Sequence, residues 1–179
     1  ASTNAVIANS AGAVTASTTA TTAQAATIAA FGQAVVYNVS GTAAEIAAAS
    51  AGARNEAVNI TITGDATIAQ ATTAEDATNS GTVTVGTISD TATLIAASTN
   101  AVIANSAGAV TASTAATVAE ATTIDAFAKA VVFAVSDTAT AIAASSNDAL
   151  DEATTVTAST TATTAQAATI AAFSQAVVY

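Results

Sequence analysis

The chain has 179 residues, of which 52% are hydrophobic, and it contains no His, Cys, Pro, Met or Trp. Its 12 acidic residues against 2 basic ones give a net charge of −10, which disfavours nucleic acid and anionic membranes as partners. The lack of His and Cys excludes Ser/His and Cys/His nucleophilic sites, His-ligated or thiolate-ligated metals, and a disulfide framework. Polar residues interrupt every apolar stretch before it reaches about 18 residues, so we expect no membrane span.

The sequence is built from copies of one segment, residues 14–50. Residues 1–50 align without a gap with residues 97–146, and 37 of the 50 positions are identical. Residues 157–179 match residues 15–37 at every position but one. The repeat is about 48 residues long, as four equivalent threonines indicate: Thr15, Thr61, Thr111 and Thr157.

We therefore expect residues 1–179 to form one continuous repeat array rather than separate globular domains. The expected parts are a partial joint at 1–13, units at 14–57, 58–109 and 110–153, and a partial unit at 154–179. Aromatic residues make up only 3% of the chain. An alanine-rich core of this kind must be thin, with backbones close together, because alanine fills little space.

In chain order, residues 1–13 are expected to be the end of a helix followed by a loop, and residues 14–17 a short strand. The counterpart of that strand at 58–63 alternates Val or Ile with Asn or Thr, which is typical of a half-buried strand. Residues 20–31 are rich in alanine and have apolar positions three or four apart, which predicts a helix. The N-caps of this helix and its copies are predicted at Thr18 or Thr19, Asp65, and Thr160 or Thr161.

A second strand is predicted in each unit, at 35–40, 82–89 and 131–136. A second alanine-rich helix should then open at Gly41-Thr42, Asp90-Thr91 or Asp137-Thr138, with the two aspartates as N-caps. The joints between units are polar, small and variable, so we expect surface loops at 50–57, 105–109 and 145–153.

Each unit therefore reads strand, helix, strand, helix, and the predicted fold class is α/β. Alternating strands and helices favour parallel strands with right-handed crossovers. We expect a repetitive solenoid of short parallel strands and alanine-rich helices, in which each unit of about 48 residues consists of two β-α half-units. The helices would cover the apolar face of the sheet, and its Thr/Asn/Ser face would be solvated or would meet a second sheet.

One sequence pattern in the chain is similar to a known class of repeats. It is Ser-[Asp/Gly]-Thr-Ala-x-x-Ile-Ala-Ala, followed by Val-Asn-Ile-Thr and Ala-Thr-x-Ala-Gln-Ala-Thr-Thr. It resembles the Ala/Thr-rich tandem repeats of giant secreted, RTX-adhesin-like surface proteins of marine bacteria and cyanobacteria. The matching residues are Ser89–Ala92, Val58–Thr61 and Ala66–Ala71, and the resemblance covers essentially the whole chain. It implies an extracellular or cell-surface scaffold, an adhesin stalk or a fibre, and it carries over no catalytic or binding residue.

Calcium is the best ligand candidate, since it takes about six to eight oxygen ligands. The joint at 145–153 holds four residues with such oxygens: Asn147, Asp148, Asp151 and Glu152. The equivalent joint at 51–56 has only Glu56, and neither EF-hand nor GGxGxD spacing occurs. This difference favours a solvated acidic loop. No other cofactor is expected.

Threonine rows are a second candidate for a binding face. A flat array of hydroxyl and methyl groups, as on ice-binding β-solenoids, could be formed by Asn59, Thr61, Thr63, Thr82 and Thr84. The alternative is that Thr is simply a good residue for the exposed face of a strand. Breaks such as Val132–Ala134 spoil a regular array, which favours that alternative.

We predict a structural role and no enzyme activity, because near-identical repeats do not easily build the unique pocket that an acid–base carboxylate pair would need. The chain would form a fibre, or the stalk of a large cell-surface protein, by stacking of near-identical units. Its main partner would be itself, through end-to-end or lateral stacking. The alternative is a binding module, in which the Thr-rich face or the acidic joints hold surface polysaccharide or another sugar, ice or calcium.

Overall fold

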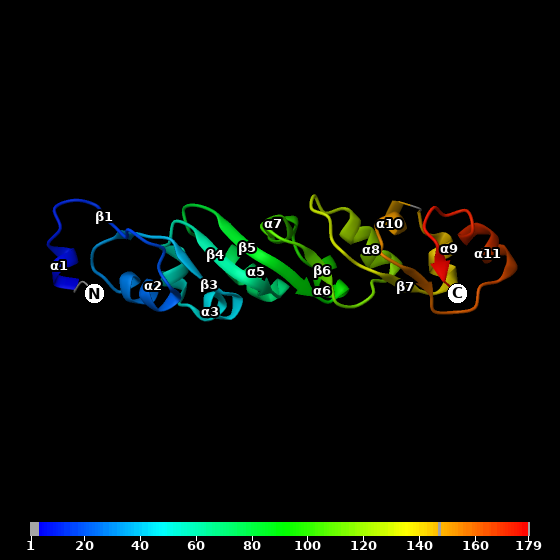
Figure 1. The fold of residues 1–179 in the computed structure, drawn as a ribbon, viewed down its shortest axis with the longest axis horizontal. Helices are drawn as coiled ribbons and strands as arrows, with labels where there is room; N and C mark the ends of the chain where they lie inside the picture. The colour runs from blue at the N-terminus through cyan, green and yellow to red at the C-terminus, as the bar shows by residue number, and fades with distance from the viewer. Residues whose placement is uncertain (1–3, 147, 179) are drawn as a thin grey trace. The chain divides into compact units, whose positions relative to one another are not determined.

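The computed structural model describes residues 4–146 and 148–178. Within them the chain forms parallel sheets with interleaved helices, so the predicted α/β class with parallel strands is confirmed. Figure 1 labels most of the helices and strands. The chain divides into two compact units: unit 1 contains residues 1–88 and 105–108, and unit 2 contains residues 89–104 and 109–179.

Unit 1 alternates short strands with helices. Its strands are β1 (Val14–Thr15), β2 (Val35–Val36), β3 (Val39–Thr42), β4 (Ile60–Ala66) and β5 (Val83–Asp90), whose last two residues belong to unit 2. Its helices are α1 (Asn4–Ala8), α2 (Thr22–Ala29), α3 (Ala43–Ala48), α4 (Ala51–Asn55) and α5 (Ile68–Glu75). β1 pairs with β2, and β3, β4 and β5 pair in that order, all in parallel. Each connection between paired strands therefore carries a helix, as parallel pairing requires.

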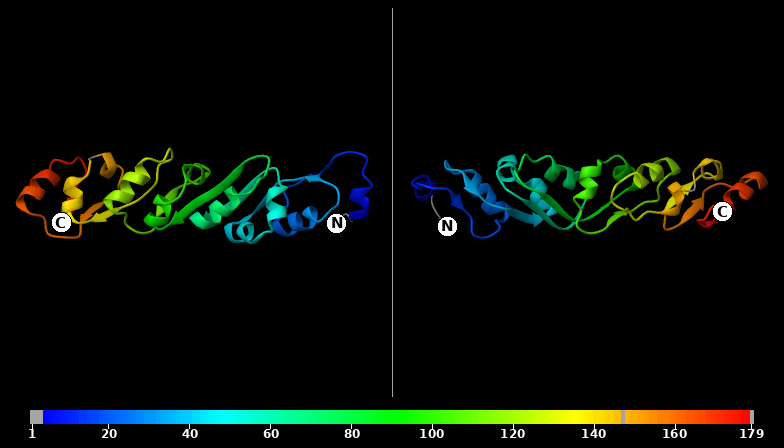
Figure 2. Two further views of the ribbon diagram at one scale, coloured as in Figure 1. Left: turned by 180° about the vertical axis from the view of Figure 1, so that it is seen from behind. Right: turned by 90° about the horizontal axis from the view of Figure 1, so that it is seen from above.

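Unit 2 repeats this alternation, as Figure 2 shows from two further sides. Its helices are α6 (Ala92–Ala96), α7 (Asn100–Ala104), α8 (Val118–Asp125), α9 (Ala139–Ala144), α10 (Asp148–Asp151) and α11 (Thr164–Ile170). Its strands are β6 (Val110–Ala112), β7 (Val135–Asp137), β8 (Val156–Ala158) and β9 (Val177–Val178). β7, β8 and β9 pair in parallel in that order, and isolated parallel bridges join Thr111 to Val132 and Ala116 to Val135.

The predicted second strand is less regular than expected. The strand predicted at 82–89 is β5, but the one predicted at 35–40 is split into β2 and β3. The split falls at Tyr37, a residue that is only 2% exposed and whose hydroxyl donates to Ala53 O at 2.9 Å. Burial raises the pKa of Tyr37 to about 12, with a further contribution from the charge of Glu56. The copy at 131–136 contributes only its end to β7, and Phe133 is buried at the position equivalent to Tyr37.

The helices begin at threonines, but not at those that the sequence suggested. The N-cap of α2 is Thr21, whose hydroxyl accepts from Gln24 N at 3.3 Å while Gln24 Oε1 accepts from Thr21 N at 2.9 Å. The same reciprocal capping box starts α5, α8 and α11, at Thr67, Thr117 and Thr163. The predicted caps at Thr18 or Thr19, Asp65, and Thr160 or Thr161 were wrong by two or three residues, because only the true caps have Gln or Glu three positions later.

The second helices open where predicted, with Thr as the cap instead of Asp. The N-caps of α6 and α9 are Thr91 and Thr138. Asp90 and Asp137 lie one residue earlier, and each accepts a hydrogen bond from the N–H of the capping threonine, at 2.8 and 2.7 Å. Each aspartate therefore fixes the residue that caps the helix rather than capping it directly.

The joints are not simple surface loops. Residues 51–55 form α4 and residues 148–151 form α10. The apolar side chains of these joints enter the core: Ala53, Ala57, Ala149 and Leu150. Arg54 Nη1 in α4 donates to Ile46 O and Ala47 O at 3.2 and 3.3 Å, and thereby closes the carboxyl end of α3. The segments at 1–13 and 97–109 likewise contain the helices α1 and α7. At the start of α7, Thr99 Oγ1 accepts from Val102 N at 3.3 Å.

The core of both units consists of single large aliphatic residues set among alanines. Ile46, Ile60, Ile62 and Ile88 are fully buried in unit 1, and Ile95, Ile103, Ile124, Ile142 and Leu150 in unit 2. The partners around them include Ala25, Ala74, Ala116 and Ala121, each with no exposed surface. A core of this kind is thin, as the composition indicated, because alanine lets helix and sheet backbones approach closely.

Candidate functional site

The predicted threonine face lies on the outer side of β3, β4 and β5. Within β4, Ile60 and Ile62 are buried, whereas Thr61 is half-buried and Thr63 is exposed, so the alternation predicted from the sequence is present. Ser40, Thr61 and Thr84 are in register across the three strands. They form a row of three hydroxyl-bearing residues across the sheet.

A second row stops after two strands. Thr63 is in register with Thr42 on β3, and its hydroxyl donates to Gly41 O at 3.2 Å. Toward β5 the register shifts between Ile62 and Asp65, and Gly64 adopts a φ of 78°, as expected for a glycine-containing bulge. The bulge therefore separates Thr63 from β5, and the rows do not form a regular two-dimensional array.

Asn59 and Thr82 belong to a different feature, a ladder of side-chain hydrogen bonds at the start of the strands. Asn38 Oδ1 accepts from Asn59 Nδ2 at 2.9 Å, and Asn59 Oδ1 accepts from Thr82 N at 2.8 Å and from Thr82 Oγ1 at 3.0 Å. Each partner lies one strand further along the chain. These amides therefore join consecutive strands, and part of their hydrogen-bonding capacity is already used within the chain.

The acidic joint contains few converging ligands. Asp148, Asp151 and Glu152 are all exposed, and Asp151 accepts a hydrogen bond from Ser174 Oγ. Asn147 lies outside the described residues. Among residues 4–146 and 148–178, no group of three or more Asp and Glu side chains is arranged to hold a metal ion. Calcium binding at this joint stays a prediction.

A helix-docking contact recurs twice in unit 2. In its first instance α6 lies against α8. Ala92 N donates to Thr114 Oγ1 at 3.1 Å, Thr93 Oγ1 donates to Glu120 Oε1 at 2.6 Å, and Ile95 is fully buried. The pKa of Glu120 is lowered, first by the hydrogen bond from the Thr93 side chain and then by that from Thr117 N.

In the second instance α9 lies against α11 through equivalent residues. Ala139 N donates to Thr160 Oγ1 at 3.0 Å, Gln166 Nε2 donates to Thr140 Oγ1 at 2.9 Å, and Ile142 is fully buried. The backbone also repeats, since Ser113 N donates to Asp90 O and Ser159 N to Asp137 O, both at 2.7 Å. The contact is thus a defined set of one apolar and three polar interactions.

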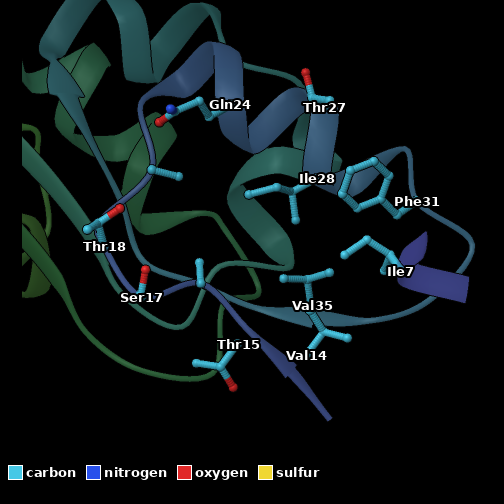
Figure 3. Close-up of a pocket in the computed structure, with 12 residues that line it drawn as sticks. Ile7, Val14, Thr15, Ser17, Thr18, Gln24, Thr27, Ile28, Phe31 and Val35 are labelled. Carbon is cyan, nitrogen blue, oxygen red and sulfur yellow. The ribbon is translucent and has the colours of Figure 1, made fainter. Parts of the chain in front are cut away.

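Unit 1 contains an open pocket of about 540 Å³ beside α2. Figure 3 shows Ile7, Val14, Ile28 and Val35 converging on its floor. Its rim is polar and carries Ser17, Thr18 and Gln24. The sequence prediction did not include this pocket. The available signal was the identity of residues 1–18 with residues 97–114, together with the Ser-Asp-Thr-Ala segment that precedes the second of these copies.

No protein-family model, curated protein or solved structure matches the chain. None of the helices in the described residues is long and apolar enough to cross a membrane. The resemblance to giant secreted repeat proteins therefore stays a prediction, and the functional argument depends on the contacts within the chain.

Proposed function

We propose that this chain is a structural repeat protein that builds length, as a fibre or as the stalk of a large cell-surface protein. The observation that carries the proposal is the recurrence of one helix-docking contact, α6 on α8 and α9 on α11, with equivalent donors and acceptors. A contact that each segment makes with the following one is the basis of stacking in repeat proteins.

Strand pairing supports the same function. Each paired strand lies beside the next one in the sequence, and partner residues are 21 to 23 positions apart, as Val14 and Val35 or Ile60 and Val83. Regular short-range pairing of this kind is what a solenoid with β-α half-units requires. We therefore include a solenoid arrangement of the repeats in the proposal.

Charge and composition suit an exposed scaffold. The net charge of −10 keeps neighbouring molecules soluble and apart, so association would take place through specific faces. With only 2 Lys and Arg residues, the chain also offers few sites to trypsin-like proteases. We place the protein outside the cell or at its surface, with other copies of itself as the main partner.

A second candidate function is binding through the threonine face. The row of Ser40, Thr61 and Thr84 gives this alternative a specific surface. The double variant Thr61→Val/Thr84→Val keeps the β-branched shape and removes two hydroxyls. A structural protein should assemble unchanged after this substitution, whereas binding of ice or surface polysaccharide through this row should be lost.

Electron cryo-microscopy of the purified chain, with and without a calcium chelator, tests the structural function. We expect filaments or end-to-end chains with an axial period set by the repeat, and we expect the chelator to leave them intact. Dispersed single molecules at high protein concentration would contradict assembly. Filaments that fall apart in chelator would assign the acidic joint at 148–152 to calcium and favour the binding alternative for that joint.

A further inference from the structure

We propose that two copies of this chain associate laterally, sheet against sheet, through the outer faces of their strands. This inference rests on the proposed structural function and names a surface through which copies would associate. The partner is the same face of a second copy, and not ice, sugar or calcium as in the binding alternative. Every copy of the chain presents this face, so both sides of the contact are available.

In unit 1 the outer face consists of two rows of small side chains. A short row joins Thr15 on β1 to Val36 on β2, and a longer row joins Ser40, Thr61 and Thr84 on β3, β4 and β5. The two strand neighbours of Thr61 are fully buried. Because successive side chains of a strand point to opposite faces, the rows lie on the face opposite to the core.

Unit 2 has the same two rows at equivalent positions. Thr111 is bridged to Val132, and Ser136, Thr157 and Val178 are in register on β7, β8 and β9. Only the last position changes residue type, from Thr in unit 1 to Val in unit 2. We call these residues of the two units the outer rows, and they contain only Ser, Thr and Val.

The apolar members of the outer rows are exposed to the same extent in both units. Val36 is 46% exposed and Val132 is 48% exposed, and each precedes a buried aromatic residue. Val6 and Val102, by contrast, are equivalent and differ widely in exposure. The matching exposure of Val36 and Val132 therefore belongs to the sheet face itself. Exposed valines beside the methyl groups of threonines form an apolar surface of the kind that marks an interaction site.

The distribution of charge points to a second copy as the partner. The chain has a net charge of −10, so two copies repel each other wherever their acidic side chains meet. The outer rows contain no charged residue, and the acidic residues within strands, Asp65, Asp90 and Asp137, lie at the last or next-to-last strand position. Two such chains can therefore come together at this face with the least repulsion. A basic partner would instead be attracted to the helices and joints, which carry most of the acids.

The outer rows also have a geometry that fits a second copy. Neighbouring parallel strands are about 4.8 Å apart, so identical rows on two copies have the same spacing. Two sheets pack face to face at about 10 Å, with their side chains interdigitating. Val and Thr are β-branched and have few rotamers, so little side-chain entropy is lost on pairing. A contact that uses the same face of both molecules closes as a dimer.

Sedimentation velocity of the full chain over a concentration series tests the lateral contact. Val132→Glu should weaken association at least about tenfold, because the new carboxylate would lose its water without gaining a partner. Val36→Glu, at the equivalent position of unit 1, should have a similar effect. Leu94→Glu is the matched control, since it adds the same charge at a side chain that is 49% exposed on α6, outside the sheet. This control should associate as the wild type does.

Two further measurements separate the uncharged rows from other contacts. Val132→Thr introduces the residue type that Thr84 has at the equivalent position, and it should leave association unchanged. Added NaCl should strengthen association, because it screens the repulsion between two acidic chains. Weakening by salt would mean that ion pairs hold the copies together, and it would overturn the proposal.

Equal losses in Val132→Glu and Leu94→Glu, or a chain that stays monomeric at high concentration, would also overturn the proposal. Single chains that bind ice or a polysaccharide, with binding lost in Val132→Glu, would assign the face to the binding alternative instead. Electron cryo-microscopy distinguishes this contact from the proposed function. Unpaired filaments would refute the lateral contact alone, whereas paired molecules that form no filaments would refute the building of length alone.

Discussion

Residues 1–18 and 97–114 have the same sequence and different surroundings. Val6 in α1 is 63% exposed, whereas Val102, at the same position in α7, is 3% exposed. Both segments form a five-residue helix followed by a short strand, so the local structure is determined by the local sequence. Burial, by contrast, differs between the two segments although their sequence is identical, so it is determined by their surroundings.

Comparing these two segments separates two contributions to stability: local structure within each copy, and burial of apolar surface against other parts of the chain. Threonine caps, alanine-rich helices and β-branched strand residues act within each copy and need no neighbour. In the proposed stacking, the apolar surface is removed from water when the next copy covers it, and this would be the larger stabilising term. A repeat of this kind should therefore have local structure everywhere and high stability only where it is covered on both sides.

The largest expected difference comes from placing a charge at the two equivalent valines. Val102→Asp puts a carboxylate without a partner into the core of unit 2 and should cost about 3–5 kcal/mol of unfolding free energy. Val6→Asp should change the stability by less than about 0.5 kcal/mol, because the side chain is already in water. Urea unfolding of both variants measures the difference, and similar losses would contradict the assignment of stability to the neighbouring repeat.

A second pair of equivalent residues tests close backbone approach. A Cβ at Gly108 would lie 2.6 Å from Thr87 Cγ2 and 2.8 Å from Gly86 O, whereas a Cβ at the equivalent Gly12 meets nothing within 4 Å. Gly108→Ala should therefore destabilise the chain by about 1–3 kcal/mol through overpacking. Gly12→Ala should be neutral, or stabilising by up to about 1 kcal/mol, because it restricts the unfolded chain.

Thermal unfolding of both alanine variants is the measurement. The wild-type chain is the common reference, and the two substitutions are chemically the same within an identical local sequence. A loss of equal size at both sites would mean that the glycines are required for local backbone conformation. Only a loss of stability confined to Gly108→Ala supports close packing of Gly108 against Gly86 and Thr87 as the cause.

The α/β class and the order of elements could be predicted because they follow from local periodicity. Residues 58–63 alternate, and residues 20–31 have helical spacing, so β4 and α2 fall close to the predicted places. The N-caps were missed because several threonines precede each helix. A capping box also needs Gln or Glu three positions after the threonine, and this second residue identifies the true cap.

The candidate site was less predictable, because it depends on register and on what covers a surface. Period-two alternation predicts that the threonines of β4 share one face, but the bulge at Gly64 interrupts their rows, and alternation alone does not reveal a bulge. The short, polar joints at 50–57 and 145–153 predict loops when the sequence alone is considered. Tertiary contacts turn them into helices, with Ala53 and Leu150 fully buried.

The buried hydroxyl of Tyr37 offers a smaller and pH-dependent difference, since Phe133 holds the equivalent position in unit 2. Tyr37→Phe should cost about 1 kcal/mol at neutral pH, because Ala53 O loses its hydrogen bond from the phenol. The folded-state pKa is about 12 against an ordinary value of 10.0, so the folded chain holds its proton more tightly. Wild-type stability should therefore fall as pH rises from about 10 to about 12, whereas the Phe variant lacks this contribution.

Tyrosinate absorbance measures the titration directly. The chain has 2 tyrosines. The variant Tyr179→Phe leaves Tyr37 as the single chromophore. A midpoint near the ordinary value of 10.0 in the folded chain would contradict burial of this hydroxyl.

The smallest expected effect is at position 120, where the copies differ only in charge. Glu120 accepts from Thr93, whereas Gln166 makes the equivalent contact to Thr140 as a donor, so Glu120→Gln should keep α6 docked with little change in stability at neutral pH. The folded-state pKa of Glu120 is lowered, so its contribution is complete above the ordinary value of 4.5 and is lost as pH falls through the folded-state pKa. The variant should lose less stability than the wild type on acidification.

Urea midpoints measured at neutral and acidic pH, for wild type and Glu120→Gln, detect this difference. Thr93→Val is the control, because it removes the hydroxyl that contributes most to the lowered pKa of Glu120. This variant should therefore also lose less stability than the wild type as the pH falls. If Glu120→Gln weakens the chain at neutral pH as much as Thr93→Val does, the docking contact needs the negative charge. The copies with Gln at this position would then bind their neighbouring helix more weakly than the copy with Glu.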